Sequence, residues 1–253
     1  MVNDMTILIT GAGSGIGHGL ANRFRAEGAT VVGCDLESQL AGCLEVCDLA
    51  VAADVRDPDQ VSGVVTAAVE KFGSVDGLIA NAGLGRRVTV ADANWEDLAD
   101  VIEVNLYGVL HSIRAVLPQM IERGTGRIVS LVSRSAEFCL PNLAGYNISK
   151  AGVIALTRTL ANELRRTDVL VNNLIPGPTN TAMNPQGTLV TDACYPTARM
   201  LMALAAGGPS GRTFYEEADY PIYARFSSHS TAAVVHENEQ RPPPGPDPAS
   251  ARS

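Results

Sequence analysis

The sequence is short of basic residues and of long apolar runs, and these shortages exclude two kinds of partner. Its 253 residues carry 19 Lys and Arg against 27 Asp and Glu, a net charge of −8. Nucleic-acid binding needs clustered basic side chains, so we expect no nucleic-acid partner. No uninterrupted apolar run approaches the roughly 18 residues that a membrane span requires, so we expect no membrane association. Met1–Met5 lacks the basic segment of a signal peptide, and we therefore expect a cytoplasmic protein.

Cysteine and histidine do not occur in the patterns that bind metals. The cysteines are odd in number, contain no CxxC pair, and are Cys34, Cys43, Cys47, Cys139 and Cys194. The four histidines are scattered along the chain. We therefore predict structural or incidental thiols and no metal site.

Short apolar runs alternate with segments of helical spacing. Apolar residues make up 46% of the chain and charged residues 18%, which provides a folded core and excludes a disordered chain. The predicted strands are at residues 6–10, 30–35, 51–55, 75–80, 127–132 and 169–175. Such near-continuous apolar strands, separated by amphipathic helices, predict an α/β fold, a doubly wound parallel sheet (Rossmann fold) with helices on both faces.

The C-terminal quarter has a weaker pattern. Residues 196–206 are predicted to be helical, and residues 212–215 are predicted to be a last strand. The segment from residue 227 is polar and proline-rich. We predict a single Rossmann-fold domain over 1–226, followed by a mobile tail over 227–253.

A glycine-rich turn joins the first predicted strand to the first predicted helix. A helix N-terminus offers unpaired N–H groups and a positive dipole end, which suit a pyrophosphate. Glycines allow the sharp turn and the close approach of phosphate. The turn therefore predicts dinucleotide binding, with cofactor contacts from Gly11, Ser14, Gly15, Ile16 and Gly17.

Asp35 ends the second predicted strand. A carboxylate there can accept hydrogen bonds from an adenosine ribose and would repel a 2′-phosphate. Leu36 is predicted to be a further cofactor contact. Neither Leu36 nor Ser14 is a basic residue that would attract the 2′-phosphate. The sequence therefore favours NAD over NADP. The alternative to a role in cofactor binding is that Asp35 is an ordinary solvated turn residue.

Tyr146 and Lys150 lie at i and i+4 and hence on one helix face. A nearby cation would lower the pKa of a phenol and let it exchange a proton with an alcohol. Ser133, predicted at the tip of the fifth strand, would offer a hydroxyl to the same substrate oxygen. The alternative is a surface tyrosine beside a solvated lysine.

Taken together, these motifs resemble the short-chain dehydrogenase/reductase family in its compact single-domain branch, over roughly residues 5 to 185. The resemblance is carried by the order of Thr10, Gly11, Gly15, Gly17, Asp54-Val55, Asn81-Ala82-Gly83, Asn105, Ser133, Tyr146, Lys150 and Pro176-Gly177-Pro178-Thr179-Asn180-Thr181. Each motif alone is common, but their joint order is specific.

The resemblance implies a role for each matching residue. Tyr146 would be the general acid/base, Lys150 would bind the ribose hydroxyls and lower the phenol pKa, and Ser133 would orient the substrate oxygen. Asn105 would hold a water that links Lys150 to solvent. The other implied cofactor contacts are Asp54 and Val55 at the adenine, Asn81, Ala82 and Gly83 at the nicotinamide ribose, and Pro176, Gly177, Thr179 and Thr181 at the carboxamide.

The expected activity is NAD-dependent hydride transfer between a secondary alcohol or ketone and the nicotinamide, with a small molecule as substrate. An NADPH-dependent ketoreductase and a catalytically silent NAD-binding sensor or scaffold are the alternatives. The family implies a homodimer or homotetramer, but the Asp-Gly-Gly end that is usual there is replaced by residues 208–217. Arg86, Arg87 and Arg134 would bind an anionic substrate unless they are paired at the surface, whereas Phe138, Leu140 and Met183 would suit an apolar one.

Overall fold

The computed structural model describes residues 2–223, in which Met1–Tyr220 form one compact unit and a second unit begins at Pro221. The predicted tail, residues 227–253, lies outside the described residues. The sheet, its helices and the candidate site belong to the first unit.

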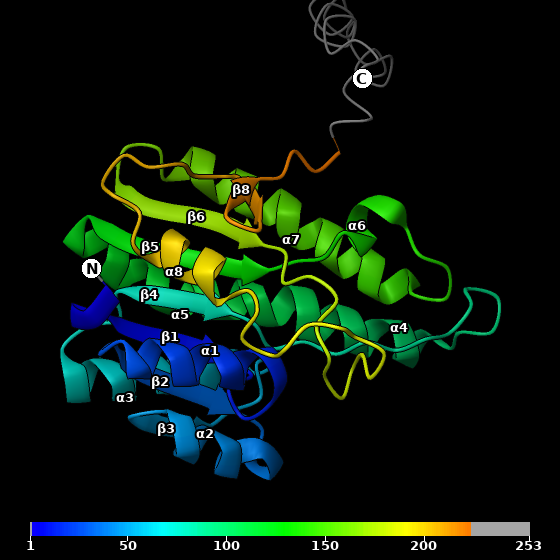
Figure 1. Ribbon diagram of the computed structural model, residues 1–253, viewed down its shortest axis with the longest axis horizontal. Coiled ribbons are helices and arrows are strands. Elements are labelled where there is room, and N and C mark those ends of the chain that lie inside the picture. The colour runs from blue at the N-terminus through cyan, green and yellow to red at the C-terminus, as the bar shows by residue number, and fades with distance from the viewer. Residues whose placement is uncertain (1, 224–253) are drawn as a thin grey trace, which may run out of the picture. The chain divides into compact units, whose positions relative to one another are not determined.

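One sheet runs through this unit in the order β3-β2-β1-β4-β5-β6-β7-β8 (Figure 1). All pairs are parallel except the last, in which β8 runs antiparallel to β7. All five residues of β1 are buried, as expected of an apolar strand covered on both faces. The strands are β1 Thr6–Thr10, β2 Thr30–Asp35, β3 Leu49–Ala52, β4 Gly77–Ala80, β5 Thr125–Leu131, β6 Asp168–Leu174, β7 Thr213–Tyr215 and β8 Ala218–Asp219.

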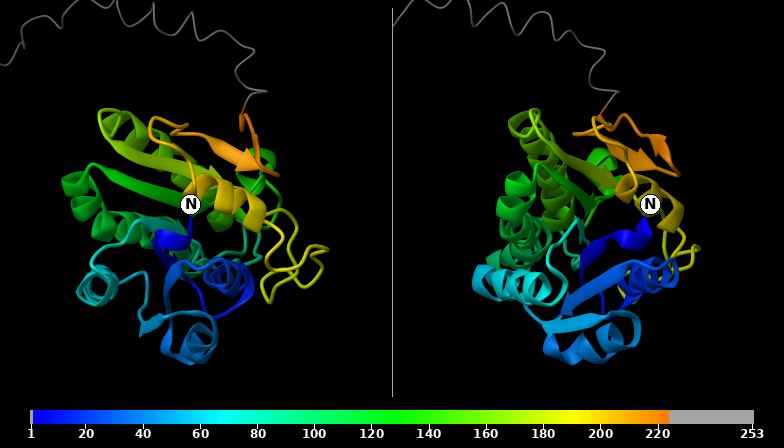
Figure 2. Two further views of the ribbon diagram at one scale, coloured as in Figure 1. Left: turned by 60° about the vertical axis from the view of Figure 1, so that its left-hand side comes forward. Right: turned by 90° about the vertical axis from the view of Figure 1, so that its left-hand side faces the viewer.

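Helices cover both faces of the sheet, which confirms the predicted fold class. The edge-on view in Figure 2 shows α1, α2 and α8 on one face and α3, α5 and α7 on the other. The helices are α1 Gly15–Ala26, α2 Leu40–Val46, α3 Pro58–Phe72, α4 Trp95–Ile102, α5 Gly108–Arg123, α6 Ser135–Phe138, α7 Ala144–Glu163 and α8 Tyr195–Met202. Short 3-10 helices are at Val2–Asp4 and Glu37–Gln39, and a π-helical turn, Glu103–Tyr107, joins α4 to α5.

Local sequence signals explain where several of these helices begin and end. Asp57 accepts hydrogen bonds from the N–H groups of Asp59 and Gln60 and thereby caps α3, whose first residue is a proline. The same helix ends at Gly73, which has a positive φ of 87°. Element existence was therefore predictable, while boundaries differ by a few residues, for example at β3, predicted over 51–55 and found at Leu49–Ala52.

The strand order reverses between β1 and β4, because the chain leaves β1 for β2 on one side and later returns to β4 on the other. In doubly wound sheets, ligands bind in the crevice at the carboxyl ends of the strands beside this point. A ligand site is therefore expected at the loops that follow β1, β2, β4, β5 and β6.

Candidate functional site

A cleft of about 720 Å³ opens at the carboxyl ends of these strands. Its volume is within the roughly 300–1,000 Å³ that is usual for small-molecule sites. It brings together most of the predicted site residues, namely Gly11, Ser14, Gly15, Ile16, Asp35, Leu36, Asp54, Val55, Asn81, Ala82, Gly83, Tyr146, Lys150, Pro176 and Thr181. Five predicted residues are not in its lining, namely Gly17, Asn105, Ser133, Gly177 and Thr179.

The start of α1 forms one end of the cleft. Ser14 occupies the N-cap position, but its side chain makes no capping hydrogen bond. The first N–H groups of the helix therefore face the cleft without a side-chain cap, next to the positive end of the helix dipole. These features fit the pyrophosphate of a dinucleotide.

Gly17 supports the turn from behind rather than lining the cleft. A Cβ added at Gly17 would lie under 3.0 Å from the carbonyl oxygen of Gly11 and from the amide of Asn81. Only glycine lets α1 lie this close to the end of β1.

A second glycine contact, which the motif did not reveal, supports the same turn. Gly42 on α2 lies against Gly13, and an added Cβ there would be under 3.0 Å from the carbonyl oxygen of Gly13. The glycine-rich turn is therefore held between α1 on one side and α2 on the other.

Asp35 also fixes this turn. Its carboxylate accepts the N–H of Gly13 at 2.9 Å and the N–H of Leu36 at 2.8 Å. Asp35 thus places a negative charge in the cleft lining beside the glycine-rich turn, where a carboxylate was expected to meet the adenosine ribose.

Thr10 ties the ends of β1 and β4 together and was not singled out for this role. Its hydroxyl accepts the N–H groups of Asn81 and Ala82, both at 3.1 Å. The side-chain amide of Asn81 donates in turn to the carbonyl oxygens of Thr10 at 2.9 Å and Gly11 at 3.0 Å. This network holds the 81–83 segment in the cleft wall.

Tyr146 and Lys150 lie one turn apart on α7 and both line the cleft. The Lys150 ammonium is 5.6 Å from the centre of the Tyr146 ring and donates to the carbonyl oxygen of Leu131 at 2.8 Å. Ser133, two residues beyond the end of β5, is half-buried, and its hydroxyl interacts with that of Ser135 at 3.0 Å. The structure thus gathers the three residues at the end of β5.

The pKa of the Tyr146 phenol differs from the sequence-based expectation. Burial raises this pKa, and the hydroxyl of Ser133 acts in the opposite direction. Burial also lowers the pKa of Lys150 to about 8. Desolvation therefore dominates at the phenol, and the Lys150 ammonium is directed at the Leu131 carbonyl.

Replacing Lys150 with methionine is expected to change the pH dependence of stability. Between pH 8 and 10.5, the unfolded chain retains a proton that folded Lys150 has released, so the wild type gains stability relative to the variant as the pH rises. The difference between the ordinary pKa of lysine, 10.5, and about 8 corresponds to about 3 kcal/mol over this window. Urea unfolding at pH 7 to 10.5 measures the difference, and exposed Lys71→Met is the matched control. A constant difference between the wild type and Lys150→Met would contradict the prediction.

Asn105 lies in the π-helical turn and is fully buried. Its Oδ1 accepts the N–H of Leu84 at 2.8 Å, and its Nδ2 donates to the carbonyl oxygen of Leu84 at 2.9 Å and to the Ser149 hydroxyl at 3.3 Å. Both amide hydrogens are used by protein groups. Asn105 therefore fixes the loop after Gly83, and its role in holding a water stays a prediction.

Gly177 and Thr179 belong to the loop that follows β6 but do not line the cleft. Thr179 is buried, and its hydroxyl donates to the carbonyl oxygen of Pro176 at 3.3 Å. Gly177 has a φ of 79° and lies against the side chains of Leu189 and Tyr215. Both residues shape the loop that presents Pro176 and Thr181 to the cleft.

A chain of charges runs along one rim of the cleft. Arg56, which lines the cleft and was not predicted, binds both carboxylate oxygens of Asp54 and lies 3.8 Å from Asp100. Hydrogen bonds from the Arg56 side chain hold the pKa of Asp54 below its usual range. Arg86 pairs with Asp97 and, at 3.3 Å, with Asp100. Arg86 is thus paired with carboxylates at the surface. Surface pairing was one of the two roles that the sequence allowed for this residue, and anion binding was the other.

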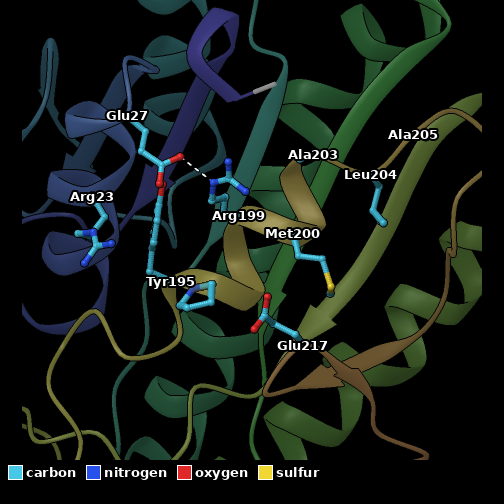
Figure 3. Close-up of a pocket in the computed structure, with 10 residues that line it drawn as sticks. Arg23, Glu27, Tyr195, Arg199, Met200, Ala203, Leu204, Ala205 and Glu217 are labelled. Carbon is cyan, nitrogen blue, oxygen red and sulfur yellow. Dashed lines mark hydrogen bonds and ion pairs between the residues drawn. The ribbon is translucent and has the colours of Figure 1, made fainter.

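A second hollow, of about 600 Å³, lies between α1 and α8 (Figure 3). Arg199 donates to Glu27 at 2.7 Å, and the Arg23 guanidinium lies 4.8 Å from the centre of the Tyr195 ring. This hollow is on a face of the sheet, away from the strand ends, and its acidic and basic side chains are matched.

Within residues 2–223, no group of three or more His, Cys, Asp or Glu side chains is placed to hold a metal ion. No helix in this range is long and apolar enough to cross a membrane. All five cysteines are free, and four of them are buried.

Comparisons with known proteins find similar proteins over most of the chain. Residues 5–188 match the profile of a family described as short chain dehydrogenase. The chain is 37% identical over 185 residues to oxidoreductase UcpA of Escherichia coli strain K12, covering 70% of each chain. It is 39% identical over 183 residues to the 3-oxoacyl-[acyl-carrier-protein] reductase FabG of Thermotoga maritima, covering 70% of this chain and 74% of that protein. The crystal structure of a 3-ketoacyl-(acyl-carrier-protein) reductase from Brucella melitensis, complexed with NADH, superposes with a TM-score of 0.79 at 33% identity, covering 85% of this chain and 97% of that one.

Proposed function

Because the chain belongs to the short chain dehydrogenase family of NAD(P)-binding oxidoreductases, we propose that it interconverts a secondary alcohol and a ketone with NAD as its cofactor. The observation that carries this proposal is the presence of Tyr146 and Lys150 in one cleft with the uncapped start of α1. Bound NAD would supply the acceptor for hydride.

The protein's own residues handle the proton and the orientation of the substrate. In oxidation, the phenolic oxygen of Tyr146 takes the hydroxyl proton of the alcohol, and in reduction it returns that proton to the carbonyl oxygen. The Ser133 hydroxyl donates a hydrogen bond to the same oxygen. Lys150 would bind the ribose hydroxyls of the cofactor, and its positive charge, 5.6 Å from the centre of the Tyr146 ring, would oppose the effect of burial on the pKa of that phenol. These roles fit a site in which protein groups supply alignment and charge.

The preference for NAD follows from the charges at the ribose end. Asp35 presents a carboxylate beside the glycine-rich turn, where a 2′-phosphate would meet like charge. One observation favours the NADPH alternative, since the cation of Arg56 lines the same cleft. That guanidinium is, however, already bound by Asp54 and close to Asp100.

Replacing Asp35 with serine is expected to shift cofactor choice toward NADPH. Removing the carboxylate relieves repulsion of the 2′-phosphate, so the ratio of the Kd for NADPH to that for NADH should fall by at least about tenfold. Fluorescence titration with both cofactors measures this ratio, and Glu37→Gln, which removes an exposed neighbouring carboxylate, is the control. Tighter binding of NADPH than of NADH by the wild type would refute the assignment of NAD.

Turnover distinguishes the proposed enzyme from a silent NAD-binding sensor. A panel of secondary alcohols with NAD and of ketones with NADH is followed by the absorbance of NADH. Turnover of any member supports the proposal, whereas binding of NADH without turnover of any member favours the sensor.

A further inference from the structure

Arg134 directly follows Ser133 and is exposed near the end of β5. Its guanidinium lies 5.3 Å from the centre of the Tyr215 ring and 5.8 Å from that of Phe138. We call these three residues the Arg134 clamp. Two aromatic contacts restrict a side chain that would otherwise be mobile in water.

The clamp lies beside the loop that borders the reacting end of the cleft. The Tyr215 ring packs against Gly177, with ring and hydroxyl atoms 3.5 and 3.7 Å from the position of an added Cβ. Pro176, the neighbour of Gly177, lines the cleft. Arg134 is therefore linked to the site on two sides, through Ser133 in the chain and through Tyr215 in space.

Two carboxylates near the clamp interact with tyrosine hydroxyls and not with Arg134. Glu137 accepts the Tyr220 hydroxyl at 2.7 Å, and Glu216 interacts with the Tyr215 hydroxyl, which raises the pKa of Tyr215. Among residues 2–223, no carboxylate lies within ion-pair distance of Arg134. Its hydrogen-bond donors have no partner among the described side chains.

This distinguishes Arg134 from Arg56, which lines the cleft, and from Arg86. Arg56 and Arg86 are each bound by two carboxylates. A planar guanidinium with a free edge is suited to bidentate binding of a carboxylate.

We propose that Arg134 binds an anionic group of the substrate, and that this enzyme therefore acts on oxo acids and the corresponding hydroxy acids. The proposal builds on the proposed alcohol–ketone activity and names its substrate class. The carboxylate pairs with Arg134, while the carbonyl or hydroxyl lies beside Ser133 and Tyr146.

The test compares each oxo acid with its own methyl ester. Reduction of 2-, 4- and 5-oxo acids and of their methyl esters is measured with NADH, and the acid-to-ester ratio of kcat/KM is calculated for each pair. A charge-assisted hydrogen bond predicts a wild-type ratio of at least about ten for one chain length. Arg134→Met should reduce that ratio to about one, and Arg134→Lys should give an intermediate value. Arg166→Met removes an exposed arginine at the opposite end of the sheet and should keep the wild-type ratio.

The ratio separates this proposal from the one on which it depends. Turnover of esters and acids with equal kcat/KM by the wild type overturns anion binding and leaves the alcohol–ketone activity intact. A wild-type preference that persists in Arg134→Met also overturns the assignment to Arg134. No turnover of any acid, ester or neutral ketone with either cofactor overturns both. If Arg134→Met does not fold, the ratio for Arg134→Lys decides the assignment, because it should fall below the wild-type ratio.

Discussion

Tyr146→Phe is expected to lower kcat by about a thousandfold, because the variant has no phenolic proton to exchange with the substrate oxygen. The loss should appear in kcat and kcat/KM alike, since the interaction acts in the transition state. Binding of NADH should change little, because phenylalanine keeps the ring on α7. Steady-state kinetics and cofactor titration together measure both quantities.

Tyr107→Phe provides the matched control for this experiment. Tyr107 is 49% exposed at the end of the π-helical turn and does not line the cleft. Its loss of a hydroxyl should leave kcat within about twofold of the wild type. Residual activity of Tyr146→Phe near the wild-type level would remove Tyr146 from the mechanism.

Gly42→Ala is expected to weaken both the fold and cofactor binding. The added methyl group overlaps the backbone of Gly13, so α2 or the glycine-rich turn must move. Overpacking of this kind costs about 1–3 kcal/mol, which outweighs the roughly 1 kcal/mol gained from a helical alanine. Displacement of the turn should also raise the Kd for NADH by about tenfold, since 1.4 kcal/mol of lost binding has that effect.

Gly63→Ala is the control for the same substitution in a helix. Gly63 is exposed on α3, and an added Cβ there meets nothing within 4 Å. The unfolding free energy of the Gly63→Ala variant should exceed that of the wild type by up to about 1 kcal/mol, with no change in cofactor binding. Thermal unfolding and NADH titration of both variants decide the matter. If Gly42→Ala behaves like Gly63→Ala, the turn is not held by α2.

Features that depend on local sequence were predictable. The strands at Thr6–Thr10 and Thr30–Asp35 were predicted with the bounds that the structure has, because each is a β-rich run with a clear break on either side. The glycine-rich turn was found for the same reason.

Features that depend on contacts between distant segments were not predictable. The Gly42–Gly13 contact joins separate elements, and nothing in the sequence around Gly42 marks it. Arg56 enters the cleft because Asp54 and Asp100 hold it there. The raised pKa of Tyr146 likewise depends on burial, which the spacing of Tyr146 and Lys150 does not reveal.

The π-helical turn at Glu103–Tyr107 has a consequence for the two helices that flank it. A π turn holds one more residue than an α turn, and one residue corresponds to about 100° of rotation about the axis. The faces of α4 and α5 are therefore out of phase with each other, and a heptad-like pattern of apolar positions followed through α4 would fail in α5. Any alignment or design that treats 95–123 as one regular helix would assign its inner and outer faces incorrectly from this turn onward.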